Sequence, residues 1–255
     1  MARHIWPSLA FALLLACGST PAPAPSPPAS TTPATPTAAP IRVLMVTATA
    51  AFRHDSIPTA RSVVAALAAR SGAFALSATE NLGDVNATRL ASTDVLMFAL
   101  TTGELAFDDT QKAAIVSFVD GGGGFIGIHS ATDTLYQWPD YGRLVGAYFK
   151  EHPWTQTAAV VVEDRAHPVT AGVETPFRIL EEFYTFQRNP RGTVNVLLSL
   201  DPRSVGADGD FPLAWAQSVG RGRSYYNALG HFDSTWNDPW FQRQLTAAIQ
   251  WTAGR

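Results

Sequence analysis

The stretch GGGGFIGIHSATD, residues 121–133, decides the fold. Its middle, Gly124 to His129, is an apolar run that predicts a buried strand, and the glycines before it predict a helix stop and a tight turn. These glycines do not form a phosphate-binding loop, because no Gly-Lys-Ser/Thr follows and they precede a strand rather than a helix. Gly127-x-His129-x-Ala131 has the small-residue frame of a nucleophile elbow, a sharp turn from strand to helix, with histidine at its centre.

Short apolar strands alternate with helices on the N-terminal side of this stretch. Such β-α-β alternation predicts an α/β domain with an open, mostly parallel sheet that is covered by helices on both faces. The predicted elements are strands at 41–46, 74–79 and 94–100, a helix with Pro58 in its first turn, and a helix from Asp108 or Asp109 through Val119.

After Pro153 the pattern changes to strands with few helices between them. A closing helix is predicted at 239–252, where Asp238 precedes Pro239. No internal repeat and no second linker interrupts this region, so one domain over residues 41–255 is expected. The strands predicted here are 157–162, 177–186, 194–200, 213–217 and 224–229.

The N-terminal residues predict export and a lipid anchor. Residues 1–16 form a signal peptide with a basic start and an apolar run too short to span a bilayer. Leu14-Leu15-Ala16-Cys17 has the pattern of a lipobox, in which the cysteine thiol is lipidated and anchors the chain; an ordinary secretory signal with an incidental cysteine is the alternative. Residues 17–40 are a Ser, Thr, Pro and Ala tether.

The expected location is the bacterial cell envelope. Gly18 after the lipidated cysteine favours the outer membrane, facing the periplasm, and the lipid would be the only contact with the membrane. A formal net charge of −3 without a basic stripe argues against a nucleic-acid partner. Cys17 is the only cysteine in the chain, so residues 41–255 hold no disulfide and no cysteine nucleophile.

Several blocks of the sequence resemble the ThuA-like, or trehalose-utilisation, family. The match covers residues 41–255, and its central block is long and specific. Glu182-Phe183-Tyr184 departs from the more usual Glu-Trp-Tyr but keeps an aromatic residue. The matching blocks are Phe52–Ile57, Gly127–Asp133, Trp138-Pro139, Tyr141-Gly142, Leu144–Phe149, His152-Pro153, His167–Thr170, Glu182–Tyr184, Gly220–Arg223 and Leu229–His231.

This resemblance implies both a fold and a class of substrate. The family's fold is similar to that of class I glutamine amidotransferases, a flavodoxin-like three-layer arrangement, and the family lacks their catalytic cysteine, as does this domain. Family members are associated with disaccharides or their 3-keto derivatives. The resemblance therefore implies a carbohydrate as partner and substrate.

The candidate site residues lie in the matching blocks. Side chains at the carboxyl ends of neighbouring parallel strands meet at one sheet edge, so His54, His129 and His231 are expected to converge there. Together with Glu182 they form a ligand set that suits zinc or a similar divalent ion. The candidate catalytic residues are His129, Glu182 and His231, and the candidate substrate-binding residues are Arg53, His54, Asp133, Trp138, His152 and Tyr184.

Two mechanisms and three functions remain open at this stage. A site without metal, and therefore without any cofactor, would use His129 and Glu182 as acid and base, since histidine titrates near neutral pH. Asp133 would orient His129 or cap the helix after the elbow. The favoured function is a hydrolase, lyase or isomerase acting on a disaccharide or 3-keto sugar; the alternatives are a non-catalytic sugar-binding lipoprotein and an envelope scaffold.

Overall fold

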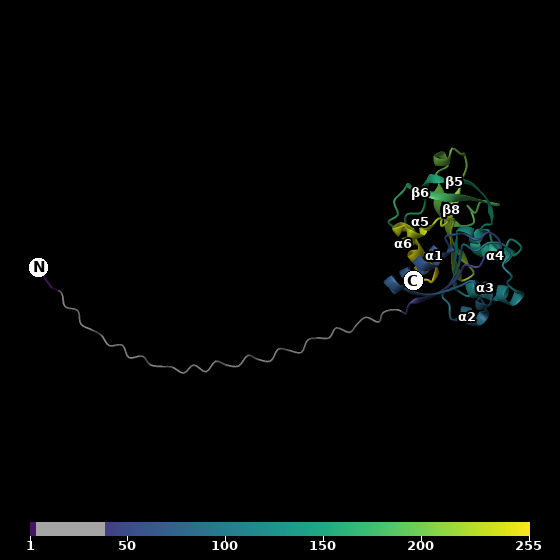
Figure 1. The fold of residues 1–255 in the computed structure, drawn as a ribbon, viewed down its shortest axis with the longest axis horizontal. Helices are drawn as coiled ribbons and strands as arrows, with labels where there is room; N and C mark the ends of the chain where they lie inside the picture. Colours follow the sequence, from purple (N-terminus) through teal and green to yellow (C-terminus); the bar gives the residue numbers. More distant parts are fainter. Residues whose placement is uncertain (4–38) are drawn as a thin grey trace, which may run out of the picture. The chain divides into compact units, whose positions relative to one another are not determined.

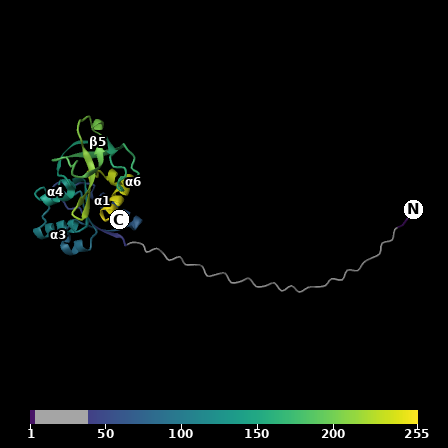
Figure 2. The same ribbon diagram turned by 180° about the vertical axis from the view of Figure 1, so that it is seen from behind.

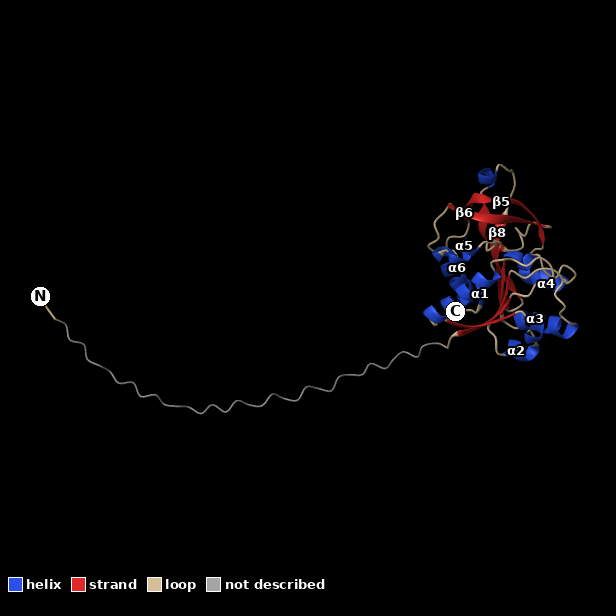
Figure 3. Ribbon diagram, in the orientation of Figure 1, coloured by secondary structure: helices blue, strands red, loops and turns tan. Residues whose placement is uncertain are grey.

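A single sheet of nine strands, in the order β2-β1-β3-β4-β9-β8-β7-β5-β6, runs through the domain (Figures 1 and 3). The computed structural model describes residues 1–3 and 39–255. Most of the predicted signal peptide, the lipidation site Cys17 and most of the predicted tether lie outside the described residues. The domain predicted over residues 41–255 lies within a unit that spans residues 39–255.

The strands and helices have the following bounds. The strands are β1 Ile41–Val46, β2 Phe74–Thr79, β3 Val95–Ala99, β4 Gly124–Ile128, β5 Phe149–Val162, β6 Phe177–Phe186, β7 Asn195–Leu200, β8 Pro212–Val219 and β9 Gly222–Asn227. The α-helices are α1 Ile57–Ser71, α2 Ala87–Ala91, α3 Asp109–Asp120, α4 Pro139–Val145, α5 Asp233–Asn237 and α6 Pro239–Thr252, and the 3-10 turns are η1 Leu82–Asp84, η2 His129–Thr132 and η3 Pro202–Val205.

One half of the sheet is parallel and carries the core. Strands β2, β1, β3, β4 and β9 pair in parallel in that order, which is the flavodoxin-like order 2-1-3-4-5. Every residue of β3 and β4 is buried, as expected for strands covered on both faces. Helices α1 and α6 lie on one side of these strands and α3 and α4 on the other, as the two opposite views agree (Figures 1 and 2).

The other half of the sheet is antiparallel, so the expectation of a mostly parallel sheet is wrong. In the described domain four strand pairings are parallel and four are antiparallel; the antiparallel pairs are β9 with β8, β8 with β7, β7 with β5, and β5 with β6. A parallel connection needs a crossover of a dozen or more residues, usually a helix. From β5 to β9 the chain has only loops and η3 between its strands and no α-helix, so these strands pair antiparallel with their neighbours.

Most predicted elements are confirmed, and the differences have physical reasons. Strand β4 ends at Ile128, because His129 already has a left-handed backbone. Strand β5 begins at Phe149 rather than at residue 157. The sequence does not predict its first part, because residues 150–156 are largely exposed and show no apolar alternation. The short helices α2, α4 and α5 carry too few turns to give a helical period in the sequence.

Strand β9 joins the two halves and brings the end of the chain to the elbow. A two-residue turn at Gly220 and Arg221 leads from β8 into β9. Gly222 starts β9 where a side-chain Cβ would lie 2.3 Å from the carbonyl oxygens of both Gly123 and Val119, so only glycine fits there. Asn227 at the end of β9 then lies opposite Ile128, which places the following loop beside His129.

The helices of the described residues are all too short or too polar to cross a membrane.

Candidate metal centre

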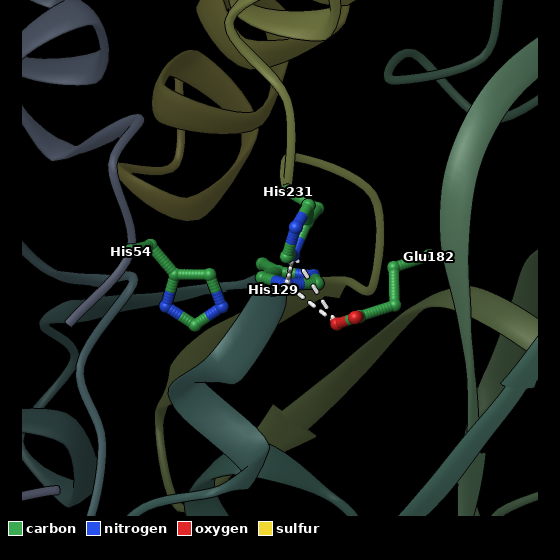
Figure 4. A group of neighbouring side chains, drawn as sticks. All are labelled: His54, His129, Glu182 and His231. Atoms are coloured by element: carbon green, nitrogen blue, oxygen red, sulfur yellow. Dashed lines mark hydrogen bonds and ion pairs between the residues drawn. The ribbon is translucent and has the colours of Figure 1, made fainter. Parts of the chain in front are cut away.

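Four side chains converge above the carboxyl ends of β4 and β9: His54, His129, Glu182 and His231 (Figure 4). His54 comes from the loop between β1 and α1, and His129 follows β4 directly. Glu182 lies on β6, and His231 lies in the loop between β9 and α5. One nitrogen or oxygen atom of each side chain lies within 4.8 Å of one such atom of every other, so the predicted convergence is confirmed.

His129 occupies a strained elbow, as the small-residue frame predicted. Its φ of 54° lies in the left-handed region, which a non-glycine residue adopts only when its surroundings enforce it. The hydroxyl of Tyr226 on β9 donates to the carbonyl oxygen of His129 at 2.7 Å. The hydroxyl of Tyr141 donates to the carbonyl oxygen of Ala131 at 2.5 Å. Two buried tyrosines therefore fix the turn from both sides.

A backbone carbonyl sets the tautomer of His129. Its Nδ1 lies 2.7 Å from the carbonyl oxygen of Ala228, and a carbonyl can only accept, so Nδ1 carries the proton and donates. In neutral His129 the lone pair is therefore on Nε2, which faces the cluster. Metal-binding histidines commonly use this arrangement, in which the second ring nitrogen donates to a carbonyl or carboxylate.

Three of the four donors already have the spacing of metal ligands. His129 Nε2 lies 3.2 Å from His231 Nδ1, His231 Nδ1 lies 3.2 Å from Glu182 Oε2, and Glu182 Oε2 lies 3.6 Å from His129 Nε2. Bonds of about 2.0–2.1 Å around a tetrahedral zinc ion place its ligand atoms roughly 3.3 Å apart. The triangle matches one face of such a tetrahedron, and two imidazoles with one carboxylate suit zinc or a similar ion.

His54 completes the cluster from the other side. One nitrogen of its ring points toward His129 (Figure 4), while its Nδ1 lies 3.5 Å from the hydroxyl oxygen of the buried Ser130. Burial, and then the nearby imidazoles of His129 and His231, lower the pKa of His54 to about 3. His54 is therefore neutral at neutral pH, the state that a metal ligand requires.

Glu182 carries the negative charge of the cluster. Burial by itself would raise the pKa of Glu182, but its contacts with His129 and His231 outweigh burial and hold that pKa below its usual range. Burial likewise opposes the charged form of His231, yet the carboxylate of Glu182 raises the pKa of His231. A cation bound in the triangle would face the same ionised carboxylate.

A second carboxyl group, that of Glu181, lies behind the first and is fully buried. It accepts hydrogen bonds from the backbone N–H groups of Gly230 at 2.8 Å and His231 at 3.3 Å, and from the hydroxyl of Thr235 at 2.5 Å. Burial raises the pKa of Glu181. This side chain fixes the loop that carries His231 and adds a carboxyl group close to the cluster.

Two further predicted residues border the cluster. The hydroxyl of Tyr184 lies 3.0 Å from His129 Nε2, and burial raises the pKa of Tyr184 well above its usual value, so the phenol stays protonated. His152 Nδ1 lies 3.3 Å from the second oxygen of Glu182, and the side chain of His152 is 50% exposed. His152 therefore lies where the cluster reaches solvent.

The other predicted residues lie elsewhere. Arg53 is exposed and donates two hydrogen bonds to Glu80 rather than facing the cluster. Trp138 is buried and stacks on Tyr141 within the core. Asp133 accepts a hydrogen bond from the hydroxyl of Tyr136 at 2.6 Å and makes none to His129, whose orientation is set by Ala228 instead.

Sequence reasoning missed the two groups that support the cluster from behind. The carbonyl of Ala228 belongs to the backbone, which leaves no signal in residue types. Glu181 is absent from the predicted site residues. The available signal was the pair of adjacent carboxyl groups, Glu181 and Glu182, within a predicted strand: their side chains point to opposite faces, and a carboxyl group on a buried face needs partners.

The described domain matches a known protein family over almost its whole length. The family model ThuA, described as trehalose utilisation, matches residues 42–252. No curated protein matches the sequence.

Three solved structures resemble the chain. A ThuA-like protein from Bacteroides uniformis shares 25% identity at a TM-score of 0.71, with 87% of this chain and 95% of that chain covered. A ThuA-like protein from Parabacteroides merdae shares 19% identity at a TM-score of 0.68, covering 84% and 90%. A protein named as part of a GMP synthase from Thermoplasma acidophilum shares 11% identity at a TM-score of 0.53, covering 84% and 94%. The extent of the family match over the described domain establishes that this chain belongs to the ThuA family.

Proposed function

We propose that this protein is an exported, metal-dependent enzyme that acts as a hydrolase, lyase or isomerase on a disaccharide or its 3-keto derivative. The observation that carries the proposal is the triangle of His129 Nε2, His231 Nδ1 and Glu182 Oε2, with edges of 3.2, 3.2 and 3.6 Å. A divalent ion there would act as a Lewis acid toward a sugar oxygen or activate a water molecule. His54 is the further nitrogen ligand available.

The chain's own groups around the triangle suit proton transfer. Tyr184 keeps its proton at neutral pH, so it can donate a hydrogen bond to an oxygen of the substrate. Glu182 stays ionised and can accept a proton or hold an ion. His152 is half exposed and contacts Glu182, so it can pass protons between the cluster and solvent.

The assignment to sugars rests on the family. Trehalose utilisation is the description of the family, and it favours a disaccharide over other substrates that a histidine and carboxylate site accepts. We also infer that the fold is related to that of class I glutamine amidotransferases. The flavodoxin-like strand order and the likeness to the GMP synthase structure support this relation, while the absence of cysteine from residues 41–255 argues against amidotransferase chemistry.

The proposal is tested by ion content and turnover in histidine variants. The purified protein is expected to bind about one zinc or cobalt ion per chain, and to convert one of trehalose, other disaccharides or their 3-keto forms in an assay followed by proton NMR. His129→Ala and His231→Ala each remove a donor of the triangle. They are expected to weaken ion binding by more than about 100-fold, since removing even an outer support costs about 10–100-fold, and to abolish turnover.

His167→Ala is the matched control, because His167 packs against Trp251 away from the cluster. This variant should keep both the ion and turnover. Turnover by wild type after complete removal of the ion would favour the metal-free use of His129 and Glu182 as acid and base. Sugar binding without turnover would favour a non-catalytic binding protein, and neither binding nor turnover would favour the scaffold alternative.

Glu181 supports the ion site by holding the loop that carries His231, so loss of its carboxylate is expected to lower the affinity for zinc. In Glu181→Gln one oxygen becomes an amide NH₂, which then faces the backbone N–H of either Gly230 or His231, because these two groups donate to different oxygens of Glu181. The dissociation constant for zinc, measured by chelator competition, is expected to rise about 10–100-fold while the far-UV circular dichroism is kept. Glu174→Gln, at an exposed position, is the control. Equal zinc affinity of the two variants would show that Glu181 does not support the ion site.

We further propose that the protein is anchored to the cell envelope by lipidated Cys17, and that it faces the periplasm from the outer membrane. The lipobox pattern Leu14-Leu15-Ala16-Cys17 supports this location. In detergent-phase partitioning, protein from a Gram-negative host should enter the detergent phase, and Cys17→Ala should stay in the aqueous phase. Equal partitioning of the two would refute the anchor.

A further inference from the structure

Phe52 is an exposed aromatic residue next to the candidate metal centre. In residues 39–255 only two large apolar side chains are exposed, Phe52 at 63% and Leu180 at 47%. The ring of Phe52 lies 4.8 Å from that of His54, measured between centroids, at 86°. Phe52 therefore directly adjoins a donor of the cluster while most of its surface faces solvent.

The backbone of Phe52 is held in place although its side chain is not buried. The hydroxyl of Thr102 donates to the carbonyl oxygen of Phe52 at 2.6 Å, and the N–H of Ala50 donates to the carbonyl of Thr102 at 2.8 Å. On the other side, Arg53 is tied to Glu80 by two hydrogen bonds. An exposed apolar ring on a fixed backbone loses little conformational freedom when a ligand covers it, which favours binding.

A second aromatic ring lies beside the cluster in the same way. Phe232 is partly buried, and its ring lies 4.6 Å from that of His231 at 76°. The imidazoles of His54 and His231 lie 5.2 Å apart, so each of two neighbouring donors carries an aromatic ring edge-to-face on its outer side. Polar donors flanked by aromatic surface suit a ligand with both hydroxyl groups and an apolar face.

We propose that Phe52 is the stacking platform for a pyranose ring of the substrate. A pyranose has a C–H face that is apolar, and covering the ring of Phe52 with it removes apolar area of both partners from water. The sugar oxygens at the ring edge would then lie toward the cluster. This inference rests on the proposed function, because it assigns a role within the same site to a residue that contributes no ligand atom.

The rival location is a cavity of about 400 Å³ between β5, β6 and the start of β8, which is lined by Trp154 and Phe211 among others. The polar groups there already have partners. Both oxygens of Asp210 accept hydrogen bonds from Arg191, and the side-chain amide of Asn189 donates to the same carboxylate. Lys150 is paired with Glu151 at 2.8 Å. Few free donors or acceptors remain for sugar hydroxyls, so the platform at Phe52 is favoured.

The test compares two substitutions of Phe52 with one in the rival cavity. Zinc-loaded wild type, Phe52→Ala, Phe52→Trp and Trp154→Ala are titrated calorimetrically with trehalose and with 3-ketotrehalose, and zinc content is measured on each sample. Phe52→Ala is expected to weaken binding of at least one of the two sugars about tenfold, which corresponds to about 1.4 kcal/mol. Phe52→Trp and Trp154→Ala should bind within about twofold of wild type, and all four should hold the same amount of zinc.

Equal affinities of wild type and Phe52→Ala, or a loss in Trp154→Ala instead, would overturn the platform. Wild type that binds neither sugar would overturn it as well. The zinc content and turnover of wild type separate this failure from that of the proposed function. If wild type holds zinc and turns over a sugar while Phe52→Ala does the same with unchanged affinity, only the platform is refuted. If wild type holds no zinc and converts no sugar, the proposed function is refuted too.

Discussion

The site depends on the left-handed backbone of His129. A φ of 54° at a non-glycine residue is unfavourable by itself, and here it turns the imidazole out of β4 at the sheet edge. The hydroxyl of Tyr226 fixes the carbonyl of this residue, and the carbonyl of Ala228 fixes its ring. Both partners come from β9 or the residue after it. The parallel pairing of β9 with β4 is therefore what makes the cluster possible.

The electrostatics of the cluster follow from the same arrangement. Burial keeps His54 neutral, and the neighbouring imidazoles keep Glu182 ionised. Glu181 adds a buried carboxyl group that accepts from the backbone of the loop carrying His231. Buried carboxyl groups and closely spaced imidazoles are costly to keep in a protein interior without a partner. Glu181 has its partners in that loop, whereas a bound divalent cation would be a common partner for Glu182 and the three imidazoles, which is the physical basis of the proposed centre.

The sequence predicted the parts of this account that depend on residue type and local pattern. Gly127 and Ala131 around His129 predicted the elbow, and the apolar strands predicted the parallel half of the sheet. The antiparallel half was misjudged as part of a mostly parallel sheet, although the lack of helices after Pro153 carried the signal. The support from Ala228 could not be predicted, because a backbone carbonyl contributes through its position alone. Arg53 and Trp138 lie in matching blocks, yet one forms a surface ion pair and the other packs in the core.

The central claim is that His129, His231 and Glu182 form a preformed ligand triangle. The most direct measurement is anomalous diffraction at the zinc absorption edge from crystals of the protein grown with zinc. The account predicts one anomalous peak about 2.0–2.2 Å from His129 Nε2, His231 Nδ1 and Glu182 Oε2. Crystals in which these side chains keep their positions while zinc binds elsewhere, or nowhere, would contradict it.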